Sequence, residues 1–83
     1  MMPKIVSVYW IDSASHPYWQ DEEEVFSALN CHTVGFLIKE NDEILVIAQS
    51  YAIDKSAKPW ADVIVIPKVS VKSQEVLKDY NIQ

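Results

Sequence analysis

Arginine is absent from this chain: the positive charge comes from 7 basic residues, all lysine, against 12 acidic residues, for a net charge of −5. Nucleic acids are dense polyanions, and the proteins that bind them normally present a basic face. Arginine is also the side chain best shaped to hold a phosphate or a guanine with two hydrogen bonds. The composition therefore disfavours general electrostatic binding of DNA, RNA or an anionic membrane, and leaves a local lysine patch as the route to nucleic acid.

Glycine and cysteine each occur once, as Gly35 and Cys31. A loop that cradles phosphate needs several glycines, so the sequence argues against nucleotide-dependent chemistry. A single cysteine cannot form an intrachain disulfide, and nothing in the composition demands an oxidising compartment. No apolar run approaches the length of a membrane span, and the first residues lack a signal-peptide pattern. We therefore expect a cytoplasmic protein of a cell or a virus-infected host, with no membrane partner.

Apolar residues are abundant, at 49% of the 83 residues. This composition argues against disorder and for one small folded domain spanning residues 1–83. A chain of this size buries only about 60–65% of the surface that its unfolded form exposes. Some of the remaining apolar surface is therefore expected to be covered by another copy of the chain.

Several segments have the composition of short β-strands, with β-branched and aromatic residues bounded by turn formers. Asn41 and Asp42 supply turn chemistry between two of them. Gly35 lies inside a strand, where a glycine usually marks a bulge, a sharp bend or the close approach of another backbone. The predicted strands are 4–12, 32–40, 43–51, 62–67 and 68–76, followed by a tail.

Residues 21–30 are the only segment with a convincing helix pattern. Asp21 can cap the segment, and Glu24 completes a capping box three residues later. Such a short helix is unstable alone and would have to dock on the sheet. The order of elements predicts a mainly β fold: a small, strongly bent antiparallel barrel of about five strands, with one short α-helix after the first strand.

The opening Trp10 and Asp12, the segment from Cys31 to Phe36 and the step Ile66-Pro67-Lys68 form a pattern that resembles a group of small uncharacterised phage-encoded proteins. These share a Trp-Asp opening, a Cys-x-x-Val-Gly-aromatic strand and an Ile-Pro-Lys step before the final strand. The resemblance implies an Sm-like barrel, a subtype of the Src-homology-3-like barrel, and rings that commonly bind RNA. This chain lacks the basic residue with glycine that marks the Sm nucleotide pocket. The matching positions are Trp10, Asp12, Cys31, Val34, Gly35, Phe36, Ile66, Pro67 and Lys68.

Cys31, His32 and His16 raise the question of a metal site or a thiol–imidazole pair. Zinc sites need about four ligands at regular spacing, which this set does not supply. Adjacent residues on a strand point to opposite faces, so His32 cannot easily serve Cys31 as a base. We interpret Cys31 as a small buried residue.

Asp12, Ser13, Ser15 and His16 contain the residue types of a hydrolytic triad. Triads place the nucleophile on a strained turn beside an oxyanion hole, and this segment lacks the glycines that usually allow such a turn. A loop held by side-chain-to-backbone hydrogen bonds is the preferred interpretation. The acidic run 21–24 is interpreted as a solvated helix start rather than a metal cluster. We therefore predict no enzyme activity and no catalytic, cofactor-binding or metal-binding residues.

Segment 62–67 is apolar on both faces, and a small barrel covers only the inner face. The uncovered outer face predicts a homo-oligomer, and a ring is one form that it can take. The aromatic residues favour core packing or a subunit interface over stacking on bases. The leading hypothesis is a self-associating structural or interaction module of phage origin. The alternative, an Sm-like ring that binds single-stranded RNA or DNA, requires lysines on one rim with exposed aromatics. The aromatics are Trp10, Tyr18, Trp19, Tyr51 and Trp60, and the lysines are Lys39, Lys55, Lys58, Lys68 and Lys72.

Overall fold

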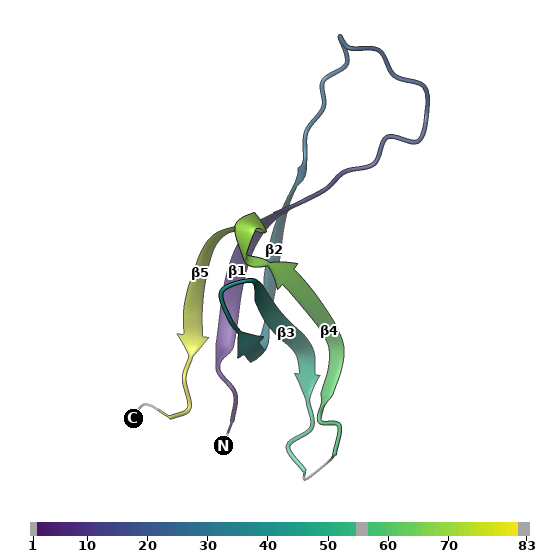
Figure 1. Ribbon diagram of the computed structural model, residues 1–83. Helices are drawn as coiled ribbons and strands as arrows, with labels where there is room; N and C mark the ends of the chain where they lie inside the picture. Colours follow the sequence, from purple (N-terminus) through teal and green to yellow (C-terminus); the bar gives the residue numbers. More distant parts are fainter. Residues whose placement is uncertain (1, 55–56, 82–83) are drawn as a thin grey trace.

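A computed structural model describes residues 2–54 and 57–81, and shows one antiparallel sheet of five strands (Figure 1). The strand order is β4-β3-β2-β1-β5, so each strand lies beside its neighbour in sequence, except that β5 returns to pair with β1. The mainly β, five-stranded antiparallel prediction is confirmed. The strands are β1 (Ile5–Asp12), β2 (Leu29–Glu40), β3 (Ile44–Tyr51), β4 (Trp60–Pro67) and β5 (Val71–Lys78).

The helix predicted over residues 21–30 is wrong, since the described residues contain no α-helix. Instead, the Asp21 carboxylate accepts a hydrogen bond from the Glu23 N–H (3.0 Å) and forms a local turn. Such side-chain-to-backbone bonds compete with helix formation. The segment also projects away from the sheet, so no surface is present on which a short helix could bury an apolar stripe.

The start of the last strand also differs from the prediction. Lys68–Ser70 form a short 3₁₀ turn, η1, and β5 begins only at Val71. Pro67 holds an extended backbone before the turn, and the Lys68 N–H donates to the Glu43 carbonyl (2.8 Å) rather than to a ladder. At the other end, β5 continues to Lys78, into the segment predicted as a tail.

The core lies where the inner face of β1 meets the inner faces of β3 and β4. β1 and β3 are not neighbours in the sheet, so their contact requires the sheet to curl over itself. The sheet remains open, because β4 and β5 are its two edges. The fully or nearly fully buried core residues are Val6, Val8, Leu45, Ile47 and Ile66, with Trp10, Leu37, Ile64 and Val71 packed against them.

The curl is centred on β2. Its residues up to Phe36 pair with β1, and those from Phe36 onward pair with β3, with a register irregularity after Leu37. Gly35 lies at this change of partner. A Cβ there would stand 2.5 Å from the Ala48 carbonyl oxygen, so only glycine allows β3 to come this close. The close approach of another backbone expected at Gly35 is therefore confirmed.

Residues 13–28, which connect β1 to β2, form a long loop that extends away from the sheet (Figure 1). We call this loop the arm. Every residue of the arm is exposed. The arm makes the molecule elongated, at 53 × 25 × 19 Å, with a radius of gyration of 16.3 Å. A compact domain of this length would have a radius of gyration of about 12 Å.

Candidate functional site

Cys31 and His32 are both in β2 but lie on opposite sides of it. In the ladder, Cys31 stands opposite Trp10 and His32 opposite Tyr9. His16 lies in the arm, where its ring meets the edge of the Phe26 ring (centroids 5.2 Å apart). No group of three or more metal-ligating side chains occurs in residues 2–54 and 57–81. Cys31 is only partly buried, so it is less enclosed than the sequence suggested.

The residues of the suspected triad are also not brought together. The Asp12 carboxylate accepts a hydrogen bond from the Ser13 N–H (2.8 Å), a local loop contact of the kind expected. His16 packs against Phe26 instead of meeting a serine hydroxyl. The segment therefore acts as the root of the arm, and nothing in its geometry activates a nucleophile.

A serine–histidine contact that the sequence did not suggest joins β1 to β2. Ser7 Oγ and His32 Nε2 lie 2.6 Å apart, and the His32 ring stacks on the Tyr9 ring with centroids 4.0 Å apart. Ser7 is only 6% exposed, so its hydroxyl cannot reach a substrate. The contact satisfies a buried hydroxyl and fixes the imidazole. Only the strand register places residues 25 positions apart in contact, and no local motif encodes it.

A cavity of about 520 Å³ opens beside this cluster, at the root of the arm. Its wall combines aromatic rings with a few polar groups, a composition common in small-ligand sites. Lys72 is the only cation in the wall. The lining residues are Tyr9, Trp10, Asn30, Cys31, His32, Lys72 and Ser73.

A second concave surface lies at the opposite end of the sheet, where β3 ends and β4 begins. The rings of Tyr51 and Trp60 lie 4.8 Å apart there, and Phe36 adjoins Tyr51 at 6.0 Å. We call this surface the aromatic cleft; its volume is about 240 Å³. It is lined by Met2, Pro3, Lys4, Leu37, Ile38, Tyr51, Trp60 and Asn81.

The aromatic residues noted in the sequence thus occupy three environments. Trp10 packs against the core, and its Nε1–H donates to Thr33 Oγ1 (3.0 Å). Tyr51 and Trp60 line the aromatic cleft. Tyr18 and Trp19 lie in the arm, where Trp19 is fully exposed. No single surface gathers them into a stacking platform for bases.

The lysines noted in the sequence are also dispersed. Lys58 and Lys68 lie beyond opposite ends of β4, in the loop before it and the turn after it. Lys39 belongs to β2 and Lys72 to β5, while Lys55 lies outside the described residues. These positions do not form one basic rim.

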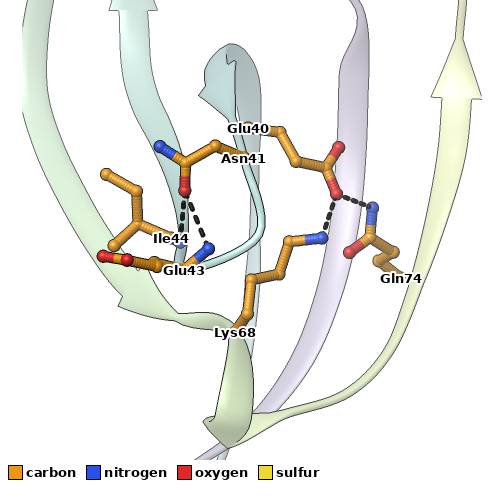
Figure 2. A network of polar contacts seen from close by, with 6 residues as sticks. All are labelled: Glu40, Asn41, Glu43, Ile44, Lys68 and Gln74. Carbon is orange, nitrogen blue, oxygen red and sulfur yellow. Dashed lines mark hydrogen bonds and ion pairs between the residues drawn. The ribbon is translucent and has the colours of Figure 1, made fainter.

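Lys68 belongs instead to a polar network that ties η1 to the sheet (Figure 2). Its ammonium group pairs with the Glu40 carboxylate, which also accepts a hydrogen bond from Gln74 Nε2 (3.1 Å). The hydrogen bond from Lys68 lowers the pKa of Glu40 below its ordinary value of 4.5. The neighbouring Asn41 carboxamide accepts the N–H groups of Glu43 and Ile44 and closes the β2–β3 turn. The network joins β2, η1 and β5.

The outer side of edge strand β4 is the clearest apolar surface of the sheet. Ile66 is buried in the core and Ile64 packs against it, whereas Val63 and Val65 are 48% and 55% exposed. Their ladder partners on β3 are Ala48 and Val46. Val63 and Val65 are therefore the pair of this segment that the single chain leaves exposed.

The chain matches no known protein family, no curated protein and no solved structure. Its described part contains no helix that is long and apolar enough to cross a membrane. The assignment of function consequently depends on the geometry of its surfaces.

Proposed function

We propose that this protein is a non-enzymatic interaction module that associates with copies of itself through β4. The observation that carries the proposal is the exposure of Val63 and Val65 on an edge strand. An edge strand presents unpaired backbone N–H and C=O groups, and natural proteins usually protect such edges with charges, bulges or covering segments. β4 carries a charge at Asp62, where the backbone is left-handed (φ 55°), and a proline at Pro67, but between them it combines a free edge with outward-facing valines, which suits pairing with another chain.

The proposal includes a bent barrel of the Sm-like or Src-homology-3-like kind. Three features support it: the return of β5 to the side of β1, the short turn η1 between β4 and β5, and the curl of β2 at Gly35. A strand shared between two halves of a sheet lets a small barrel bury one core. The phage origin and the cytoplasmic location are parts of the same proposal, and rest on the sequence motifs and composition.

A ring follows if the two edges of the sheet pair head to tail. β4 and β5 lie at opposite edges, so β4 of one copy can meet β5 of the next, and repetition closes a cycle when the rotation permits. β5 contributes Val76 and Leu77, each about half exposed, to such a contact. Pro67 ends the β4 ladder because it has no N–H to donate, which helps fix the register.

Two observations favour an interaction role over the alternatives. The wall of the larger cavity holds Cys31, His32 and Lys72, but His32 bonds the buried Ser7 and the Cys31 thiol bonds the Leu29 carbonyl, so the cavity contains no paired nucleophile and base. The alternative of a ring that binds single-stranded RNA or DNA required a shared lysine rim. Lys68 is engaged by Glu40, and Lys58 lies at the other end of β4, so that alternative loses its main support.

Light scattering coupled to size exclusion at micromolar concentration tests self-association. We expect the wild type to elute as a multiple of its 9.5 kDa mass, and the double variant Val63→Lys/Val65→Lys to shift toward the monomer. Val69→Lys is the matched control, because Val69 is almost fully exposed in η1 and lies outside the β4 ladder. Circular dichroism checks that each variant is folded. A wild-type mass near 9.5 kDa would contradict the proposal.

A further inference from the structure

The arm leaves large apolar side chains in solvent. Trp19 is fully exposed, and Tyr18 and Val25 are 82% and 92% exposed. Only Phe26 has a partner ring, that of His16 on the opposite limb of the arm. Contiguous exposed apolar groups on a small protein usually mark a binding surface.

The arm is also the acidic part of the molecule. Residues 13–28 hold four of the 12 acids, the run Asp21 to Glu24, and no lysine. The remainder of the chain holds eight acids and seven lysines, a net charge of −1. The arm is therefore an acidic segment that carries aromatic side chains, and it suits an apolar recess with a cation at its rim.

The aromatic cleft has these properties. Tyr51, Trp60 and Leu37 form apolar walls, and Lys4 stands at the rim. The Lys4 side chain is 44% exposed, and 3.9 Å separates its Nζ from Oδ2 of Asp79, whose side chain is 14% exposed. Because this contact is long, the exposed side of the Lys4 ammonium group can also meet an incoming carboxylate.

The cleft lies at the end of the sheet opposite the arm of the same chain. β1 starts beside the cleft at Ile5 and ends at Asp12, where the arm begins, and the arm continues outward from there (Figure 1). An eight-residue strand is roughly 26 Å long. The arm and the cleft are thus the two ends of an elongated molecule, which is the arrangement that head-to-tail contact between copies requires.

We infer that the arm of one copy docks in the aromatic cleft of a second copy, with Trp19 packed against the Tyr51–Trp60 pair and the acids after Trp19 facing Lys4. An aromatic side chain buries about 150–250 Å². Tyr18, Trp19 and Phe26 together therefore approach the roughly 800 Å² per partner of a stable interface. This inference rests on the proposed self-association and adds to the pairing of the β4 edges a second contact, between the arm of one copy and the aromatic cleft of another.

Disulfide trapping between copies tests the contact. All variants carry Cys31→Ser, which removes the native thiol. One variant adds Gln20→Cys next to Trp19; the other adds Asn81→Cys in the cleft wall and a tag that separates the mixed dimer on a gel. Docking gives each introduced cysteine an effective concentration near the other on the order of millimolar. At about 10 µM of each chain we therefore expect the mixed disulfide to form roughly 10- to 100-fold faster than by random collision.

Two matched controls define the result. Lys72→Cys, exposed on β5 at the arm end of the sheet, replaces Asn81→Cys as an acceptor away from the cleft. Trp19→Ser in the Gln20→Cys chain removes the aromatic anchor and should abolish the preference for the cleft. Equal rates with both acceptors, or a preference that survives Trp19→Ser, would overturn the inference. If light scattering of the wild type still shows an oligomer in that case, self-association stands without the arm; a monomer overturns both.

Discussion

Gly35 in β2 and Ala48 in β3 approach so closely that a Cβ on Gly35 would lie 2.5 Å from the Ala48 carbonyl oxygen and 2.7 Å from Ile47 Cγ2. The first of these neighbours is backbone and cannot turn aside. The contact is made where β2 changes its partner from β1 to β3, so the closeness of these two residues is part of what lets the sheet curl around its core.

Replacing Gly35 by alanine or valine should therefore destabilise the fold. Overpacking of this kind costs about 1–3 kcal/mol, and we expect the free energy of unfolding to fall by that amount in urea titrations. Ala61→Val, which adds bulk at an exposed position of β4, should change it by less than about 0.5 kcal/mol. A stable Gly35→Val variant would mean that β3 does not approach β2 in this way.

Truncation of a core side chain should strongly lower the stability of the protein, because the core is small. Ile66 is fully buried among Val8, Leu45 and other core residues, and Ile66→Ala should cost about 2–5 kcal/mol. Domains of this length have a total stability of about 4–12 kcal/mol, so the variant should be close to unfolding at room temperature. Val69→Ala, at an exposed position, should lie within about 0.5 kcal/mol of wild type. Thermal unfolding followed by circular dichroism measures both.

The Glu40–Lys68 pair predicts a specific dependence of stability on pH. Because the pKa of Glu40 is lower in the folded state than its ordinary value of 4.5, the carboxylate stabilises the fold above that value. The contribution is lost as the pH falls through the lowered pKa. Both side chains are about one-third exposed, so the effect is small, about 0.2–1 kcal/mol.

Glu40→Gln measures this contribution. The variant should be less stable than wild type at about pH 7, and the difference should shrink as the pH falls below 4.5 and through the lowered pKa of Glu40, where the wild-type side chain becomes neutral as well. Glu23→Gln, in the exposed arm, removes the same charge away from this network and serves as the control. A difference that stays constant over this pH range would show that the ionised form of Glu40 gains nothing from Lys68.

Binding to nucleic acid should be weak. A net charge of −5 opposes approach to a polyanion, and dispersed lysines make few phosphate contacts, so binding should also fall with added salt. Fluorescence anisotropy with a labelled unstructured RNA at about 150 mM salt should show no sub-micromolar affinity. Tight binding under these conditions would restore the single-strand-binding ring as the better hypothesis. Lys72→Gln, in the wall of the larger cavity, would then be the first variant to compare with wild type.

The sequence alone determined the strands, because their signals are local. Alternating β-branched residues, the Asn41 turn and the stop at Pro67 act through neighbouring residues, and they gave the mainly β class and most strand positions. The single glycine, inside a predicted strand, indicated a bulge, a sharp bend or a close backbone approach. This signal is also local, because the absence of a Cβ is a property of the residue itself. The spare apolar pair of segment 62–67 also followed from alternation along one strand.

The tertiary structure determined the features that local sequence signals do not encode. Asp21 and Glu24 form a credible capping box, yet the segment is a loop because the arm leaves the sheet and offers the helix nothing to dock on. The Ser7–His32 contact depends on strand register, and the Glu40–Lys68 pair on where η1 returns to β2. The placement of Trp19 and Trp60 at opposite ends of the molecule depends on the direction in which β1 and the arm run. Each of these relationships joins residues distant in sequence, and only the packed sheet fixes the distances between them.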